Sequence, residues 1–143
     1  GPPLKVYRKP SSVFVARFLG SPPMNIVPVS IAHREGVDTA AIGGAAVRLR
    51  DALQCNGSAL LGFRPEDVPL TDPNGAPRAQ VTAVELLGAE TIVSATLEGG
   101  SSIAVRAPRD LLARPGDVIG LSIGPDALHL FDPETGAALA RQN

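Results

Sequence analysis

The stretch AQVTAVELLGAETIVSATLE, residues 79–98, decides which fold class the sequence indicates. β-Branched residues are frequent in it, and apolar and polar residues alternate over 93–98, as in half-buried strands. Gly88 stands between its two halves, and glycine readily adopts the backbone conformations that tight hairpin turns require. The stretch therefore predicts a strand–turn–strand unit with strands at 79–87 and 91–98.

The same alternation extends outward from this unit in both directions. Further candidate strands lie at 26–31, 45–50, 58–64, 102–106, 118–123 and 127–131, with a weaker one at 37–42. TDPNG (71–75) and DPETG (132–136) are turn sequences. The 15 glycines and 14 prolines among 143 residues suit short strands joined by frequent turns. We predict a mostly β chain, a sandwich or small barrel, in which 108–117 forms at most one or two helical turns.

The first 24 residues differ from the rest in pattern. An apolar face made of Phe14, Val15, Phe18 and Leu19 has helical spacing. Gly20 then supplies a helix-ending residue, and the prolines from Pro22 on prevent the helix from continuing. We expect a short N-terminal helical segment whose apolar face packs against another surface.

Composition excludes several function classes. The net charge of −1 gives no general attraction to nucleic acid or acidic lipid. The single cysteine, Cys55, forms no internal disulfide and fits a reducing compartment. The two histidines, His33 and His129, do not have metal-ligand spacing with Cys55 or with each other, so we expect no metal site.

Catalytic and nucleotide-binding motifs are not evident. Lysine occurs only at positions 5 and 9, and neither follows a glycine, so no phosphate-binding G-K-[ST] loop is present. GLSIG (120–124) fits G-x-S-x-G, but it lies in a candidate strand rather than at a strand-to-helix turn. We expect no catalytic residue and no cofactor-binding residue in this chain.

The aromatic residues are few. The sequence has four Phe, one Tyr and no Trp, and Phe63 and Phe131 both lie in apolar runs. Single-stranded nucleic acid is bound by exposed aromatic side chains beside a basic groove. We expect both phenylalanines to be core residues, and we expect no nucleic-acid partner.

Four segments taken together resemble a known family. PLKVYRKPSSVFVARFLGSPPMN (3–25), LLGFRPEDV (60–68), VTAVELLGAETIV (81–93) and HLFDPETGAAL (129–139) occur in the order typical of the C-terminal region of ATP-binding subunits of sugar-type ABC importers, the maltose and glycerol-3-phosphate class. The resemblance spans nearly the whole chain. It is carried by several motifs in one order, which is more specific than any single motif.

The resemblance implies a regulatory (TOBE) domain, an OB-type β-barrel with additional strands. It implies that residues 1–24 are the end of the ATPase domain and a linker helix, and that 25–143 are the regulatory domain. The residues that match the family motifs are Gly20, Pro22, Met24, Asn25, Gly62, Arg64, Pro65, Glu66, Glu85, Gly88, Glu90, His129, Phe131, Asp132 and Gly136.

The resemblance also implies a function. We expect a non-catalytic regulatory and dimerisation module, with ATP and Mg²⁺ bound by an ATPase domain that this chain does not contain. The expected partners are a second copy, the ATPase domain, the importer's membrane subunits and, in some relatives, a regulatory protein. The expected location is cytoplasmic, at the inner face of the cell membrane.

Two alternatives stay open. The first is an oxyanion-binding barrel, for which Arg64 is the best candidate cation, although its expected role is to pair with Glu66 or Asp67. The second is a nucleic-acid-binding OB-fold module.

Overall fold

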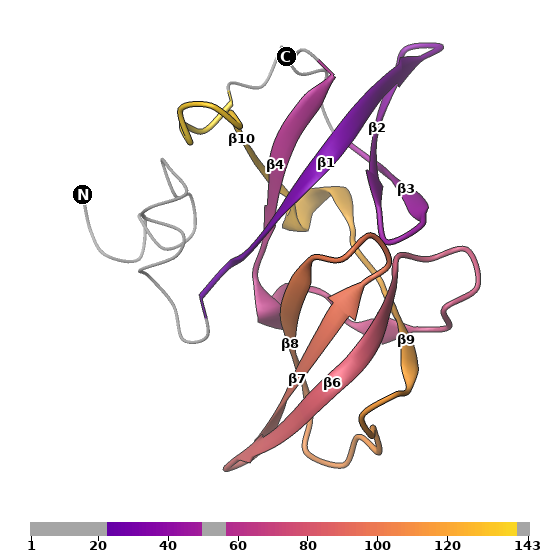
Figure 1. The fold of residues 1–143 in the computed structure, drawn as a ribbon, viewed down its shortest axis with the longest axis vertical. Coiled ribbons are helices and arrows are strands. Elements are labelled where there is room, and N and C mark those ends of the chain that lie inside the picture. The colour runs from indigo at the N-terminus through magenta and orange to yellow at the C-terminus, as the bar shows by residue number, and fades with distance from the viewer. Residues whose placement is uncertain (1–22, 50–56, 140–143) are drawn as a thin grey trace.

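The structure, a computed structural model, describes residues 23–49 and 57–139 and is mostly β (Figure 1). The strands are β1 (Asn25–Arg34), β2 (Val37–Ile42), β3 (Ala45–Arg48), β4 (Ser58–Phe63), β5 (Leu70–Thr71), β6 (Arg78–Leu87), β7 (Glu90–Leu97), β8 (Ser102–Pro108), β9 (Val118–Leu121) and β10 (His129–Phe131). Two single-turn 3-10 helices, η1 (Pro65–Asp67) and η2 (Pro125–Ala127), lie between strands. The prediction of a mostly β chain is confirmed.

The strands form two five-stranded antiparallel sheets. The order is β10-β4-β1-β2-β3 in the first sheet and β5-β9-β6-β7-β8 in the second. In Figure 1 the first sheet occupies the upper half of the molecule and the second the lower half.

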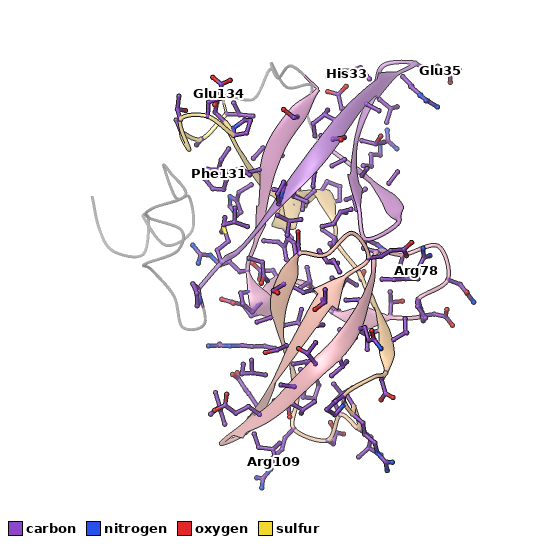
Figure 2. All side chains as sticks on the ribbon, in the orientation of Figure 1. His33, Glu35, Arg78, Arg109, Phe131 and Glu134 are labelled. Carbon is purple, nitrogen blue, oxygen red and sulfur yellow. The ribbon has the colours of Figure 1, made fainter. Side chains whose placement is uncertain are left out.

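Two hairpins of the first sheet have two-residue turns of the kind that matches the twist of the strands. Glu35 and Gly36 both have positive φ, 52° and 76°, which fits a type I′ turn between β1 and β2. Gly43 and Gly44 also have positive φ, 57° and 79°, which fits a second type I′ turn between β2 and β3. Beside the first of these turns, a hydrogen bond joins the side chains of His33 and Asp38, with His33 Nδ1 2.5 Å from Asp38 Oδ1 (Figure 2).

One continuous hydrophobic core joins the two sheets. Residues of both contribute to it because every second side chain of a strand faces inward. β8, for example, alternates between buried and less buried positions along its length. The core side chains include Val27, Val29, Ile31, Ala40, Leu61, Phe63, Val81, Val93, Val105 and Leu121.

A backbone hydrogen bond also joins the sheets at the β2–β3 turn, beside an ion pair within the second sheet. Arg78 at the start of β6 donates its backbone N–H to the carbonyl of Gly43, with an N–O distance of 2.9 Å. The Arg78 side chain donates to Glu98 through Nε at 2.9 Å and through Nη2 at 2.5 Å. A Cβ on Gly44 would lie 2.4 Å from Arg78 Nη2, so glycine lets the hairpin approach this ion pair.

The structure differs from the sequence prediction at three places. Residues 108–117 contain no helix; a turn bond from the Leu111 N–H to the Pro108 carbonyl is followed by an irregular connection. The strand predicted at 127–131 begins only at His129, after η2. The strand β5, two residues long, was not predicted because only its pairing with β9 defines it. The predicted N-terminal helix lies outside the described residues.

Candidate functional site

Motif residues from distant parts of the chain meet where the chain enters β1. Met24 is 3% exposed and forms a small hydrophobic cluster with Phe131, which is 0% exposed. Gly62 of β4 lies beneath them: a Cβ there would be 2.7 Å from Met24 Sδ and 2.8 Å from the Phe131 ring. His129 of β10 pairs with Gly62 across the strands. The structure therefore brings these four motif residues together at one end of the first sheet.

The neighbouring residue Asn25 connects this cluster to the second sheet. Its Nδ2 donates to the carbonyl of Ala104 in β8 at 2.8 Å, and its Oδ1 accepts the Ala104 N–H at 2.8 Å. β8 is an edge strand, so the asparagine amide occupies backbone groups that no neighbouring strand pairs. We call this pair of bonds the Asn25 clasp. Through it, two consecutive residues anchor the chain to both sheets, Met24 to the first and Asn25 to the second.

A cleft of about 440 Å³ lies beside the clasp. Its lining combines the incoming chain with hydroxyl groups and backbone of the second sheet, from residues Pro23, Met24, Asn25, Ile26, Thr82, Ser94, Ala95, Ser102, Ile103 and Ala104. No charged side chain is among these lining residues. The polar groups that these residues can offer to a ligand are hydroxyl, side-chain amide and backbone groups.

The motif RPED (64–67) follows β4 directly and forms η1. Arg64 is 4% exposed and Pro65 is fully buried, whereas Glu66 is exposed. The pKa of Asp67 is raised above its usual value, first by burial and second by the charge of Glu66, while the Arg64 guanidinium opposes both effects. Arg64 therefore acts electrostatically on Asp67, in the direction that a pairing of the two would give.

The DPETG segment forms the predicted turn after β10. The Asp132 carboxylate accepts the backbone N–H groups of Glu134 at 2.8 Å and Thr135 at 3.0 Å, and these bonds hold its pKa below the usual value. Gly136 has a φ of 75° and donates its N–H to the Asp132 carbonyl. Both residues thus shape the turn (Figure 2, near Glu134).

The remaining motif residues lie at the opposite end of the molecule, on the β6–β7 hairpin (Figure 1). Glu85 and Glu90 are exposed, and Glu90 Oε2 lies 3.4 Å from Arg106 Nε of β8. Gly88 has a φ of 61° in the two-residue turn between Leu87 and Glu90, and this positive φ confirms the prediction that the position needs a conformation costly for other residues.

Replacing Gly88 by valine is expected to lower the free energy of unfolding by about 1–2 kcal/mol, because a β-branched residue at positive φ is strained. No atom lies within 4 Å of the added Cβ, so the loss would come from the backbone alone. Gly124→Val is the matched control: that glycine has open space and a φ of −81°. Urea unfolding of both variants checks this, and equal stability would contradict it.

Sequence reasoning missed Thr91, which follows Glu90 and faces the core. Its side chain is 0% exposed, and within the described part of the chain its Oγ1 has no hydrogen-bond partner. A buried hydroxyl without a partner costs free energy. In the sequence, the only feature that marks Thr91 is that a polar residue stands at an inward-facing position of a predicted strand.

Replacing Thr91 by valine is expected to raise the free energy of unfolding by about 1 kcal/mol, since it removes this hydroxyl and keeps the shape. The matched control is Thr82→Val, because the Thr82 hydroxyl donates to the Ser94 carbonyl at 3.1 Å. Thermal unfolding of both proteins would test the difference. A loss of stability in the Thr91 variant would show that its hydroxyl does make a stabilising bond.

Several predicted residues lie outside the described ranges. These are the motif residues Gly20 and Pro22 and the apolar face of Phe14, Val15, Phe18 and Leu19. Over residues 23–49 and 57–139, no three His, Cys, Asp or Glu side chains are grouped so that they could hold a metal ion. None of the helices in these same ranges has the length and apolar character needed to cross a membrane.

Comparison with known proteins shows which family and which solved structure this architecture resembles. Residues 61–131, from β4 to β10, match the family model of the TOBE domain. A solved structure of the cytoplasmic molybdate-binding protein ModG, with molybdate bound, superposes on 76% of this chain and 96% of its own, with a TM-score of 0.61 and 18% identity. At this identity the likeness concerns the fold alone.

Curated relatives extend the match to almost the whole chain. The sn-glycerol-3-phosphate import ATP-binding protein UgpC of Ruegeria pomeroyi is 39% identical over 141 residues, which cover 98% of this chain and 38% of the relative. The protein of the same name from Ralstonia nicotianae is 40% identical over 146 residues, 94% of this chain and 39% of the relative. The chain thus spans about two fifths of the length of these relatives.

These matches and the two-sheet fold show that the chain carries a TOBE domain. More particularly, the chain matches the C-terminal region of UgpC-type ATP-binding proteins of sugar-type ABC importers.

Proposed function

We propose that this chain is the regulatory and dimerisation module of the ATP-binding subunit of a sugar-type ABC importer. The observation that carries the proposal is the match of more than nine tenths of the chain to proteins named as import ATP-binding proteins. In this proposal residues 1–24 are the end of the ATPase domain with its linker, and 25–143 are the regulatory domain, an OB-type barrel with additional strands. The module itself is not catalytic.

The geometry around Met24 and Asn25 supports this division. A regulatory domain must hold a defined orientation to the domain that precedes it, and the two consecutive anchors provide one. The Met24 side chain packs on Phe131, and the Asn25 amide bonds to Ala104. A movement of the chain before residue 24 would therefore act on both sheets.

The same proposal also implies where ATP binds, which partners the subunit has and where in the cell it acts. ATP and Mg²⁺ would bind to the ATPase domain and not to this module. The partners would be a second copy, the importer's membrane subunits and a regulatory protein. The subunit would act in the cytoplasm, at the inner face of the cell membrane.

Oxyanion binding is a second candidate because of the fold likeness to molybdate-bound ModG. A cleft of about 420 Å³ opens between the sheets, lined in part by Gly43, Gly44, Gly99 and Ser101. Glu98 also lines it, and a carboxylate there opposes an anion. Arg64, the cation favoured from sequence, is buried. The carboxylate at the cleft and the burial of Arg64 favour the regulatory role over oxyanion binding.

The structure gives little support to nucleic-acid binding. Phe63 and Phe131 are both 0% exposed, so neither presents a ring on which a base could stack. This burial confirms the prediction that both are core residues.

Sedimentation velocity of the 143-residue chain over a wide concentration range tests the proposal. We expect a reversible dimer, and a strict monomer at the highest soluble concentration would contradict the dimerisation role. Thermal unfolding with molybdate or a sugar phosphate tests the second candidate. A ligand at 100 times its dissociation constant would stabilise by about 2.7 kcal/mol, and such a gain without a change of size would favour the binding role.

A further inference from the structure

The loop that leads into β6 (Figure 1) carries the dipeptide Asn74-Gly75. Asn74 and Gly75 are both exposed, whereas Pro77, near the end of the loop, is buried. Asp72 Oδ1 accepts the backbone N–H of Asn74 at 2.8 Å, and Gly75 has a φ of 76°. The loop is therefore a hydrogen-bonded turn whose tip is open to water.

The side-chain amide of Asn74 and the backbone nitrogen of Gly75 are both free to react. Over residues 23–49 and 57–139, no hydrogen bond is made by the Asn74 side-chain amide or by the Gly75 N–H. No atom lies within 4 Å of the position that a Cβ on Gly75 would take. The Gly75 nitrogen can thus approach the Asn74 side chain without first breaking a bond to another group.

We propose that Asn74 is a site of spontaneous deamidation, in which the Gly75 backbone nitrogen attacks Cγ of the Asn74 side chain. A bond forms between this nitrogen and Cγ, and the bond from Cγ to Nδ2 breaks. The proton of the Gly75 N–H passes by way of water to the departing Nδ2, which leaves as ammonia, and a cyclic imide remains. Water then adds to either carbonyl carbon of the imide, so the ring opens to aspartate or to isoaspartate. Water is the only co-reactant, and nothing is oxidised or reduced.

Glycine is the following residue that hinders this attack least. A side chain on residue 75 would crowd the backbone nitrogen, and glycine moves most freely among the backbone conformations that ring closure requires. Asn25 provides the contrast within the same chain. It precedes Ile26, it is 7% exposed, and its amide is bonded through both Nδ2 and Oδ1 to Ala104. We expect the Asn25 amide to stay intact while Asn74 reacts.

The isoaspartate product changes the backbone itself, because the former side-chain carbon becomes part of the main chain. The loop has little room for a longer path on its inner side: a Cβ on Gly120 of β9 would lie 2.5 Å from the Asp72 carbonyl oxygen. The Leu121 N–H also donates to the Pro77 carbonyl at 2.9 Å, so both ends of the loop are held on β9. We expect the isoaspartate form to unfold at a lower urea concentration than the unmodified chain. Asn74→Asp, which reproduces the aspartate product and keeps the backbone length, should change this midpoint little.

Incubation of the full 143-residue chain at neutral and at mildly alkaline pH tests the site. Cleavage after glutamate gives fragment 67–85, which contains Asn74, and fragment 1–35, which contains Asn25. Asn56 also precedes a glycine, lies outside the described residues and falls in neither fragment. By mass spectrometry we expect Asn74 to convert to both isoaspartate and aspartate, faster at the higher pH because the Gly75 nitrogen must lose its proton, with Asn25 unchanged.

Two results would overturn the inference. Conversion of Asn74 to aspartate alone would mean that water attacks the amide directly and that no imide forms. An Asn74 that stays intact in the folded chain would mean that the site does not react; a synthetic peptide of residues 70–77 then shows whether the fold or the sequence protects it.

Gly75→Ala is the variant that tests the attacking nitrogen. We expect it to slow the conversion of Asn74 several-fold, because the added methyl group crowds that nitrogen. The same substitution in the 70–77 peptide keeps the comparison free of strain in the turn, since the positive φ of Gly75 is costly for alanine in the folded chain. Ala76→Ser is the matched control and should leave the rate unchanged. Equal rates for Gly75→Ala and the wild type would overturn attack by the Gly75 nitrogen.

Discussion

Replacing Phe131 by alanine is expected to lower the free energy of unfolding by about 3–5 kcal/mol, the usual cost of removing a fully buried aromatic side chain. Phe131 is 0% exposed, and it forms the small cluster with Met24 over Gly62. The surrounding strands can collapse only partly into the cavity, since Gly62 has no side chain to fill it.

Guanidinium unfolding would measure this loss as a lower midpoint with little change of slope. Leu112→Ala is the control, because Leu112 is 96% exposed and its truncation should change stability little. Met24→Ala tests the cluster further: since Met24 and Phe131 share contacts, their combined loss should differ from the sum of the single losses. A loss below about 1 kcal/mol for Phe131→Ala would contradict its place in the core.

Strand positions and several turns could be predicted from the sequence, because they depend on local patterns. Alternation over 93–98 predicted a strand that the structure places in β7. Gly88 and the DPETG segment were read as turn residues, and both adopt turns. The short run between Pro108 and Pro115 was misread as partly helical; six residues between prolines are too few to repay helix nucleation.

The contacts that hold the two sheets together could not be predicted in this way. Asn25 and Ala104 are 79 residues apart, and nothing in the local sequence of either marks the other. The bond from the Arg78 N–H to the Gly43 carbonyl likewise depends on how the start of β6 lies beside the β2–β3 turn. The family motifs named Asn25 as a residue of interest, but only the structure shows what its amide bonds to.

The second large effect on stability is expected for Asn25→Asp at neutral pH, because this substitution changes one of the two hydrogen-bonding groups of the Asn25 clasp. An aspartate there would face the Ala104 carbonyl with an oxygen in place of the donating Nδ2, in a site where the side chain of residue 25 is 7% exposed. Burial and the facing carbonyl both disfavour the charged form, so the pKa of this aspartate would be raised above the usual value of about 3.9. We expect a loss of about 3–5 kcal/mol at pH 7, as for an uncompensated buried charge.

The sign of the pH dependence distinguishes the clasp from simple packing. In the Asn25→Asp variant, the protonated carboxyl could donate to the Ala104 carbonyl and accept its N–H, as the amide does. With the folded pKa above the unfolded one, the folded variant binds the extra proton more tightly, so its stability relative to wild type recovers at about pH 4 and is lost as pH rises through the raised pKa. Asn25→Ala should instead lose about 2–3 kcal/mol at both pH values, because it leaves the Ala104 groups without partners and adds no titrating group. Urea unfolding of all three proteins at pH 4 and pH 7 measures this. A deficit of the Asn25→Asp variant that does not change with pH would mean that the amide bonds to Ala104 are not what holds the incoming chain to the second sheet.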